Sequence, residues 1–152
     1  MIWPGDLLSI ILATVFGTVI GIEREFHGKA AGLRTNILIC LGAAVFTLIS
    51  ERMSAGADSS VTRIAAQIVT GVGFLGAGTI IQDRGGVHGL TTAATIWLVA
   101  SIGMACGAHL YKLALTTTLI AILVLIGFAR VARPLEHQHE KSKRNNSSDD
   151  PI

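Results

Sequence analysis

The sequence predicts an all-α protein that crosses a membrane with about five helices. Hydrophobic residues make up 51% of the 152 residues and charged residues only 14%, against about 25% charged residues in average soluble proteins. The charges gather in short clusters between apolar runs, each close to the roughly 20 residues that cross a bilayer. This pattern excludes a soluble domain, and a net charge of +2 gives no basic surface for nucleic acid.

The five expected spans form one transmembrane domain over residues 1–128. The first span ends at Glu23, and the second stops at Glu51. The third has no charge but carries Gln67, Thr70 and four glycines, so it is either continuous or broken, and a re-entrant segment in a four-span protein is the alternative. The spans are about 7–22, 34–50, 64–81, 90–106 and 111–128.

The boundary between the third and fourth spans is expected to be a turn over residues 82–89. Paired glycines and charges there cannot continue a helix in lipid. The fourth span opens with Thr91 and Thr92, whose hydroxyls suit helix capping, and it contains Trp97. The last run is the most strongly apolar, so its assignment as a span follows directly from hydropathy.

Lysines and arginines set the expected orientation, because basic residues are held on the cytoplasmic side during insertion. In a five-span protein nine fall on one side and three on the other, which predicts an outer N-terminus and a cytoplasmic C-terminus. The first span has no cleavage site after it and is expected to be retained. The polar segment 129–152 is expected to be a disordered cytoplasmic tail. The nine are Arg24, Lys29, Arg34, Arg84, Arg130, Arg133, Lys141, Lys143 and Arg144, and the three are Arg52, Arg63 and Lys112.

Cysteines and histidines give no sign of a metal centre or an active site. Cys40 and Cys106 lie inside apolar runs without partners at metal-ligand spacing, so buried free thiols are expected. The histidines lie near span ends or in the tail, where no nucleophile, base and orienting residue come together. We therefore expect no catalytic residue, no cofactor and no enzyme activity.

Glycines are spaced for helix packing. Residues 71–76 match the pattern G-x-G-x-x-G of dinucleotide-binding folds, but they lie in a span and lead into further span, which excludes that interpretation. Glycines four residues apart share a helical face and predict close contacts within the chain or a homodimer seam. The expected packing glycines are Gly17, Gly21, Gly71, Gly73, Gly76, Gly78, Gly103 and Gly107.

Charged residues at the expected cytoplasmic end are the main functional candidates. Glu23 follows the first span, where a carboxylate is unfavourable unless Arg24 or Arg34 pairs with it. Asp83 lies in the turn over residues 82–89, which is expected on the same, cytoplasmic side of the membrane. Glu23 and Asp83 are therefore a weak candidate pair for Mg²⁺, without a clear ligand set.

Four separated motifs carry a family resemblance that extends from about Leu7 to Phe128. The motifs are Gly21-Ile-Glu-Arg-Glu, Ala31-Gly-Leu-Arg-Thr-Asn36, Gly71-Val-Gly-Phe-Leu-Gly-Ala-Gly78, and Gly89-Leu-Thr-Thr-Ala-Ala94 followed by Trp97. In this order they resemble the MgtC/SapB family. Carried over by the resemblance, the matching residues of the first two motifs are Glu23, Arg24, Arg34, Thr35 and Asn36.

The resemblance implies a bacterial inner-membrane protein linked to magnesium limitation and acid stress. Virulence-associated members add a folded cytoplasmic domain after the last helix, whereas the segment here is a polar tail. The chain therefore resembles the shorter, SapB-like branch. The inhibition of ATP synthase proposed for the virulence-associated branch is not carried over.

The expected function is non-enzymatic regulation of membrane energetics or of adaptation to low magnesium and acid. The protein is expected to be a homodimer that acts through contacts inside the bilayer, with another membrane protein as a further partner. A small divalent-cation transporter or sensor is the alternative, and a scaffold in a larger membrane complex is a third. A Glu23 satisfied by arginine and a packed third span would favour regulation, whereas a cavity shared by Glu23 and Asp83 would favour transport.

Overall fold

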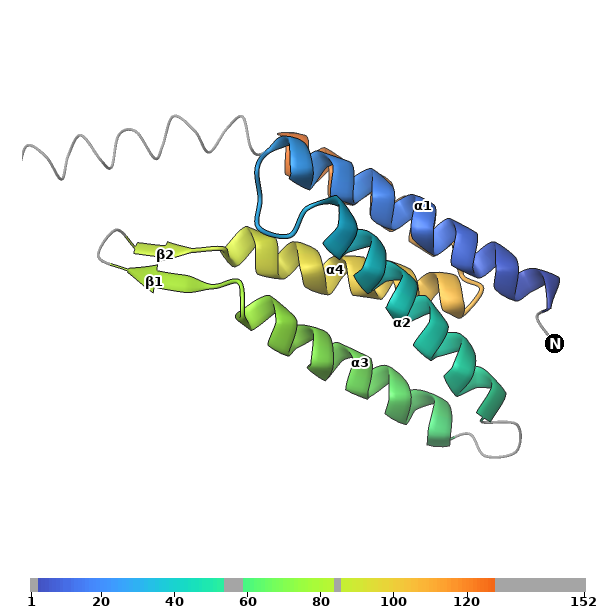
Figure 1. Ribbon diagram of the computed structural model, residues 1–152. Coiled ribbons are helices and arrows are strands. Elements are labelled where there is room, and N and C mark those ends of the chain that lie inside the picture. Colours follow the sequence, from blue (N-terminus) through green and yellow to red (C-terminus); the bar gives the residue numbers. More distant parts are fainter. Residues whose placement is uncertain (1–2, 54–58, 84–85, 128–152) are drawn as a thin grey trace, which may run out of the picture. The chain divides into compact units, whose positions relative to one another are not determined.

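The computed structural model describes residues 3–53, 59–83 and 86–127 (Figure 1). Contacts divide the chain into a first unit, Met1–Thr118, and a second unit, Leu119–Ile152. A helix over Tyr111–Gly127 begins in the first unit, and residues 119–127 are the described part of the second. The other elements are α1 (Pro4–Phe26), α2 (Leu33–Met53), α3 (Ser59–Ala77), β1 (Ile81–Asp83), β2 (Gly86–His88) and α4 (Leu90–Gly107).

Helix α1 is longer at both ends than the apolar run that predicts it. Pro4 occupies the first turn, where its missing N–H is not needed, and the Asp6 carboxylate accepts a hydrogen bond of 2.9 Å from the Trp3 N–H. At the other end the helix continues through Glu23 to Phe26. Gly28, with φ +59°, then turns the chain toward α2.

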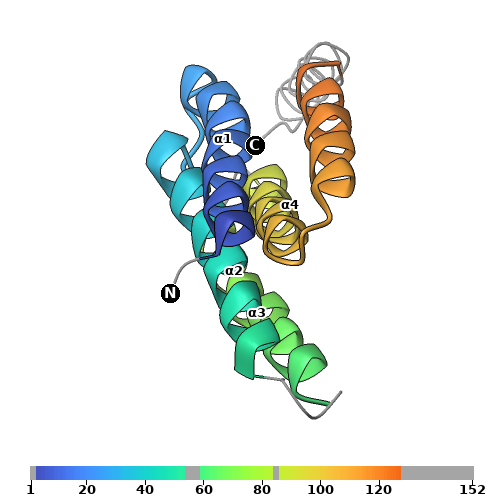
Figure 2. The same cartoon turned by 90° about the vertical axis from the view of Figure 1, so that its right-hand side faces the viewer.

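Helix α2 packs against both α1 and α4 at very short distances, and Figures 1 and 2 show these helices from two sides. A Cβ added at Gly17 would lie 3.0 Å from the Asn36 carbonyl oxygen, and one at Gly103 would lie 2.1 Å from the Cys40 carbonyl oxygen. The core forms where these three helices meet. Its hydrophobic members are Ala13, Phe16, Ile20, Cys40, Ala43, Ala44, Leu48, Ile96, Val99, Ala100, Ile102, Ala105 and Cys106.

Helix α3 is continuous and ends earlier than expected. The helix stops at Ala77, four residues before the end of the expected span of 64–81, and Ile81 already belongs to a strand. The Thr79 N–H donates to the Gly76 carbonyl at 3.0 Å, which tightens the last turn. The glycines of this segment therefore lie in or directly after an unbroken helix and do not interrupt it.

The segment expected to be a turn is a short antiparallel β-hairpin. Its register pairs Ile81 with His88, Gln82 with Val87 and Asp83 with Gly86, and all six residues are exposed. Gly89 then has φ +87° and leads into α4, and a Cβ at that position would lie 1.9 Å from the Thr79 carbonyl oxygen. This close approach requires glycine at the end of the hairpin.

Within the part of the chain that the structure describes, three helices are long and apolar enough to cross a membrane: α1, α2 and α4. Helix α3 and the helix Tyr111–Gly127 have shorter apolar stretches among the described residues. Apart from the hairpin, the described chain is helical, as expected for a helical membrane protein. Five spans and their orientation remain predictions, and the expected tail at 129–152 lies outside the described residues.

Candidate functional site

The carboxylate of Glu23 is buried and bound by the neighbouring arginine. Arg24 Nη2 donates to Glu23 Oε1 at 2.7 Å, Arg24 Nε donates to Glu23 Oε2, and the two residues are only 3% and 7% exposed. His27 Nδ1 lies 3.1 Å from Glu23 Oε1. Both carboxylate oxygens of Glu23 are therefore engaged within one turn of α1, which disfavours a role for this residue as an open metal ligand.

The second motif, residues 31–36, leads into the first turn of α2. Asn36 is fully buried, and its Nδ2 donates to the carbonyls of Ala31 at 2.8 Å and Gly32 at 2.7 Å. Arg34 and Thr35 are exposed, and Arg34 forms no ion pair among the described residues. The sequence left two possible partners for Glu23, and in the structure Arg24 is the one that binds it.

Asp83 and Glu23 belong to different elements, since Glu23 lies near the end of α1 and Asp83 lies in β1. Asp83 lies on the exposed hairpin, where its Oδ1 is 3.4 Å from Nε2 of His88. Within residues 3–53, 59–83 and 86–127, no group of three or more His, Cys, Asp or Glu side chains could hold a metal ion.

The threonines of the fourth motif divide between the core and the surface. Thr92 and Thr95 are buried, and Thr95 Oγ1 donates to the Thr91 carbonyl at 2.8 Å, while Thr91 itself is exposed. Trp97 is half-exposed and lines a small cavity of about 200 Å³ between α3 and α4. These hydroxyls and this ring mainly support helix packing.

A polar cluster at the opposite end of the helices was not predicted from the sequence. His109 Nδ1 lies 3.2 Å from Ser9 Oγ and 2.8 Å from the Tyr111 hydroxyl, and His109 Nε2 lies 3.6 Å from a carboxylate oxygen of Glu51. The Tyr111 hydroxyl also donates to the Gly5 carbonyl at 3.1 Å. Ser9 is fully buried, so this arrangement joins helix ends and does not expose a nucleophile.

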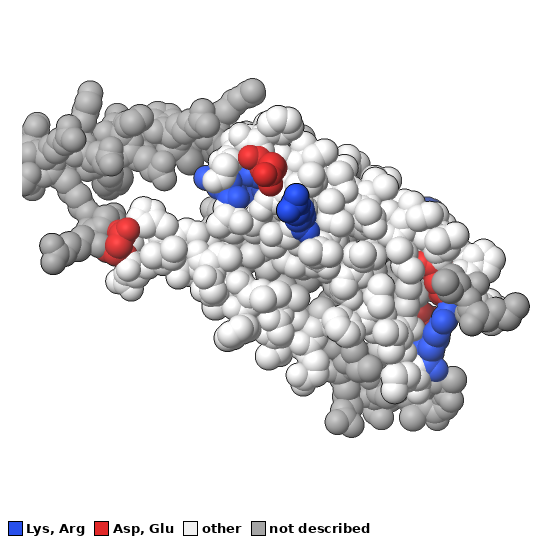
Figure 3. All heavy atoms as spheres, viewed as in Figure 1, with Lys and Arg blue, Asp and Glu red and all other residues white. Residues whose placement is uncertain are grey.

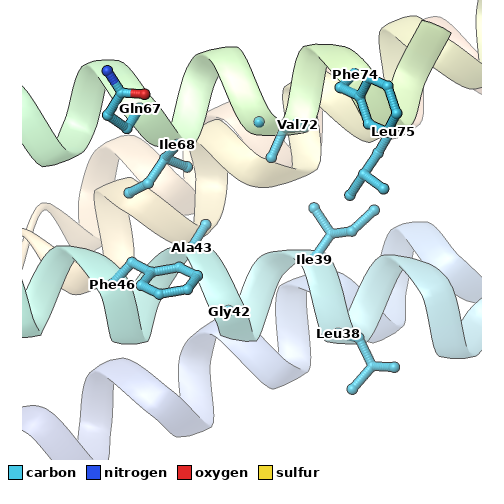
Figure 4. Close-up of a pocket in the computed structure, with 11 residues that line it drawn as sticks. Leu38, Ile39, Gly42, Ala43, Phe46, Gln67, Ile68, Val72, Phe74 and Leu75 are labelled. Carbon is cyan, nitrogen blue, oxygen red and sulfur yellow. The ribbon is translucent and has the colours of Figure 1, made fainter. Parts of the chain in front are cut away.

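An apolar groove lies between α2 and α3 in the first unit. It encloses about 680 Å³, and in Figure 4 Ile39 from α2 and Val72 from α3 point into the space between the two helices. Hereafter it is called the α2–α3 groove. Its lining residues are Leu38, Ile39, Gly42, Ala43, Phe46, Gln67, Ile68, Gly71, Val72, Phe74 and Leu75.

One face of α3 borders this groove and is exposed along its length. Gln67, Thr70, Gly71 and Phe74 follow the helical spacing of three and four residues and are all exposed. Phe74 is 79% exposed. These four residues are called the α3 face. Polar and small residues on one face of an apolar helix are typical of helix contacts in membranes.

The expected packing glycines differ in what surrounds them. Gly17 and Gly21 on α1, and Gly103 and Gly107 on α4, approach α2 within the chain, and Gly76 approaches Ala93. Gly78 lies within ordinary contact distance of the end of its own helix. The expectation of packing is wrong for Gly71 and Gly73 within the described chain, because a Cβ at either position would have no atom within 4 Å.

Charged side chains gather toward the two ends of the face shown in Figure 3. Between them lies a band of uncharged residues, which includes the parts of α2 and α3 visible in this view. The α2–α3 groove is lined by apolar side chains and Gln67. Such a surface suits contact with lipid or with another apolar helix, and it does not suit binding of a charged solute.

Comparison with known proteins gives a consistent result. The model of the MgtC family matches residues 10–134. The protein MgtC of Brucella suis is 47% identical over 141 residues, which cover 91% of this chain and 58% of that protein. The protein MgtC of Salmonella typhimurium is 44% identical over 140 residues, covering 89% of this chain and 59% of that protein.

A further relative carries a name that refers to magnesium. The Escherichia coli protein named "Putative magnesium transporter YhiD" is 45% identical over 127 residues, covering 78% of this chain and 58% of that protein. The chain thus spans a little under three fifths of the length of these curated relatives. No solved structure is similar to the chain.

Proposed function

The chain belongs to the MgtC family, and from this premise we propose that it is a non-enzymatic regulator in the bacterial inner membrane. It crosses the membrane five times, with its N-terminus outside. It acts on membrane energetics, or on adaptation to low magnesium and acid, through contacts with proteins inside the bilayer. It needs no resident cofactor.

The observation that carries this proposal is the open surface formed by the α3 face and the α2–α3 groove. It is apolar, it is large enough to accept side chains of another helix, and it carries exposed glycines. In lipid there is no hydrophobic driving force between helices, so close packing and polar contacts decide association. A surface with small residues and one amide therefore favours a protein contact.

The charge distribution along the helices also supports regulation. Ion-coupled carriers usually place a charged residue near the membrane midplane. Among the described residues, the middle turns of α1, α2 and α4 are uncharged, and α3 has no charged residue after Arg63. Glu23, which directly follows the first span, is bound by Arg24, as expected for a regulator, whereas α3 is largely exposed and does not meet the expectation of a packed third span.

Complementation of growth tests the proposal. A strain that lacks the chain should grow poorly at low magnesium and at low pH, and the wild-type chain should restore growth. Gly42 lines the groove, and a Cβ there has no atom within 4 Å, so Gly42→Leu should fill the groove without disturbing the fold. This variant should fail to restore growth at equal membrane levels.

Gly127→Leu provides the matched control, because a Cβ at Gly127 also has no atom within 4 Å and Gly127 does not line the groove. It should restore growth as well as the wild type does. Full complementation by Gly42→Leu would count against a role for the groove.

Magnesium transport is the second candidate, and it is favoured by the name of YhiD. Liposomes that contain the purified chain should take up labelled magnesium no faster than empty liposomes if the protein is a regulator. Uptake that depends on the chain and saturates with magnesium concentration would replace regulation by transport.

A further inference from the structure

His109 occupies a backbone position that usually requires glycine. Helix α4 ends in a Schellman motif, in which the His109 N–H donates to the Cys106 carbonyl at 3.1 Å. The Leu110 N–H donates to the Ala105 carbonyl at 2.8 Å. Among the described residues, His109 is the one non-glycine residue with a positive φ, +59°. This conformation is unfavourable for a residue with a Cβ, so contacts of the side chain must hold it in place.

The imidazole of His109 joins the end of α4 to three other helices. Its Nδ1 lies 2.8 Å from the Tyr111 hydroxyl on the last described helix and 3.2 Å from Ser9 Oγ on α1. Its Nε2 lies 3.6 Å from Oε2 of Glu51 on α2. A Cβ built at Gly5 would lie 3.5 Å from Cε1 of the ring, so the ring also packs against the first turn of α1. A positive charge on this ring is favoured by the C-terminal end of α4.

Both ring nitrogens of His109 face hydrogen-bond acceptors. The Tyr111 hydroxyl donates its one proton to the Gly5 carbonyl at 3.1 Å, so its oxygen is left to accept from Nδ1. On the other side of the ring, Nε2 faces the carboxylate of Glu51. A neutral imidazole carries one N–H and an imidazolium carries two. Only the protonated ring therefore satisfies both partners.

The Ser9 hydroxyl does not remove this preference. Its Oγ lies 3.2 Å from Nδ1 of His109 and 3.0 Å from the Tyr111 oxygen, and it has one proton to donate. If it donates to a bare Nδ1, that nitrogen and the Tyr111 oxygen still face each other at 2.8 Å with no proton between them. Tyr111 must then move away from the ring or release the Gly5 carbonyl, so the neutral ring loses one contact.

The other charged groups near this end of the helices do not replace Glu51 as the partner of His109. Asp6 on α1 pairs with Arg52 on α2. Lys112, on the last described helix, is exposed. Glu51 is thus the carboxylate that faces the ring, and the side chain of His109 is 38% exposed, so it exchanges protons with the solution.

We propose that His109 is a pH-sensitive clasp. In its protonated form it holds the end of α4 to α1, α2 and the start of the last described helix, and loss of the proton loosens this corner. Histidine side chains ordinarily titrate near about pH 6.5 and glutamate side chains near about pH 4.3. The clasp is closed in mild acid between these values, and it opens as the pH rises.

The clasp goes beyond the proposed function, because it adds a response to pH that a membrane contact alone does not require. The proposed orientation places the end of α4 on the outer side of the membrane, so the clasp responds to the pH of the solution outside. Only this placement rests on the proposed function, since the contacts of the ring are those of the fold itself.

Thermal unfolding of the full chain in mixed micelles, at about pH 5.5 and about pH 8, tests the clasp. The wild type should unfold several degrees higher at the lower pH. His109→Asn should lose more than half of this difference, because asparagine tolerates the left-handed backbone but takes up no proton. Glu51→Gln, which removes the facing carboxylate, should do the same.

His88→Asn is the matched control. His88 also lies near a carboxylate, 3.4 Å from Oδ1 of Asp83, but on the exposed hairpin, where it joins no helices. This variant should keep the wild-type difference between the two pH values. A wild-type difference in both His109→Asn and Glu51→Gln overturns the clasp, and so does a wild type that unfolds at one temperature at both pH values.

Hydrogen exchange of single amides shows where the response to pH lies. The protection factor of the Leu110 N–H, which belongs to the cap of α4, should be about fivefold higher at the lower pH in the wild type. In His109→Asn it should not depend on pH. The N–H of Ile102, in the buried part of α4, should keep the same protection at both pH values. An equal change at Ile102 overturns a local clasp.

The clasp and the proposed function can be separated. If His109→Asn loses the pH response but restores growth at low pH as well as the wild type does, the clasp is supported and its part in regulation is overturned. Failure of this variant at low pH, with growth restored at low magnesium, supports both. If a membrane-impermeant maleimide labels Lys112→Cys only after permeabilisation, the proposed orientation is overturned and the clasp faces the cytoplasm.

Discussion

At the scale of single residues, the pair of Glu23 and Arg24 shows how charge is held at the end of an apolar bundle. Both side chains are buried, and the pair is bidentate between neighbours in sequence. A buried pair adds little net stability compared with apolar residues, but loss of one partner leaves an uncompensated charge. Its role is therefore visible when only one member is replaced.

Arg24→Met should lower the free energy of unfolding by about 3–5 kcal/mol, because Glu23 then remains buried without its partner. Equilibrium unfolding in mixed micelles, followed by far-ultraviolet circular dichroism, measures this. The double variant with Glu23→Gln should recover most of the loss. Arg34→Met is the control and should change little, because Arg34 is exposed. Wild-type stability in Arg24→Met would show that the pair is not needed.

At the scale of elements, two helices approach closely where a glycine of one helix faces the backbone of the other. Gly103 on α4 faces the Cys40 carbonyl, whereas Gly71 on α3 faces open space. The two glycines have the same residue type and the same helical setting. They differ only in their neighbours, so they form a natural comparison.

Gly103→Ala should destabilise the protein by about 1–3 kcal/mol, because the added methyl group would lie 2.1 Å from a backbone oxygen that cannot move aside. Gly71→Ala should be neutral, or stabilising by up to about 1 kcal/mol, since alanine favours the helix and meets no atom there. Unfolding of both variants in the same micelles checks the difference. Equal stabilities would contradict the close contact between α4 and α2.

The sequence predicted most helices, because an apolar run that is bounded by charges and crosses a membrane satisfies its backbone hydrogen bonds by forming a helix. It placed the end of α3 too late, because Ile80 and Ile81 continue the apolar composition while the backbone has already left the helix. Hydropathy alone does not distinguish a three-residue strand from the end of an apolar helix, and Ile81, which pairs with His88, begins such a strand. Local spacing likewise marked both Gly71 and Gly103 as packing sites, and only the tertiary arrangement separates the two.

The candidate site was predictable only in part for the same reason. Glu23 and its arginine partner were found from charge next to an apolar run, since such a charge needs compensation. The α2–α3 groove brings together Ala43 and Ile68, which are far apart in the sequence, and no local pattern joins them. Gln67 was the one local signal, as a lone amide in an uncharged span.

At the scale of the whole molecule, orientation in the membrane is the property that labelling can test. Lys29 lies in the loop between α1 and α2, and Lys112 lies near the start of the helix Tyr111–Gly127. Both are exposed, and they are predicted on opposite sides of the membrane. In intact cells, a membrane-impermeant maleimide should label Lys112→Cys and should label Lys29→Cys only after permeabilisation. The buried native thiols give a low background. The reverse labelling pattern would place the N-terminus in the cytoplasm.

The glycines that hold α1 and α4 against α2 also limit how the protein can rearrange. Side chains can slide past one another by changing rotamers, but a helix backbone seated directly on another backbone has no such freedom. The three helices therefore form a fixed block, and shear between them is blocked. Of the labelled helices, α3 buries the fewest described side chains, so tilt or rotation of α3 meets the least resistance from packing.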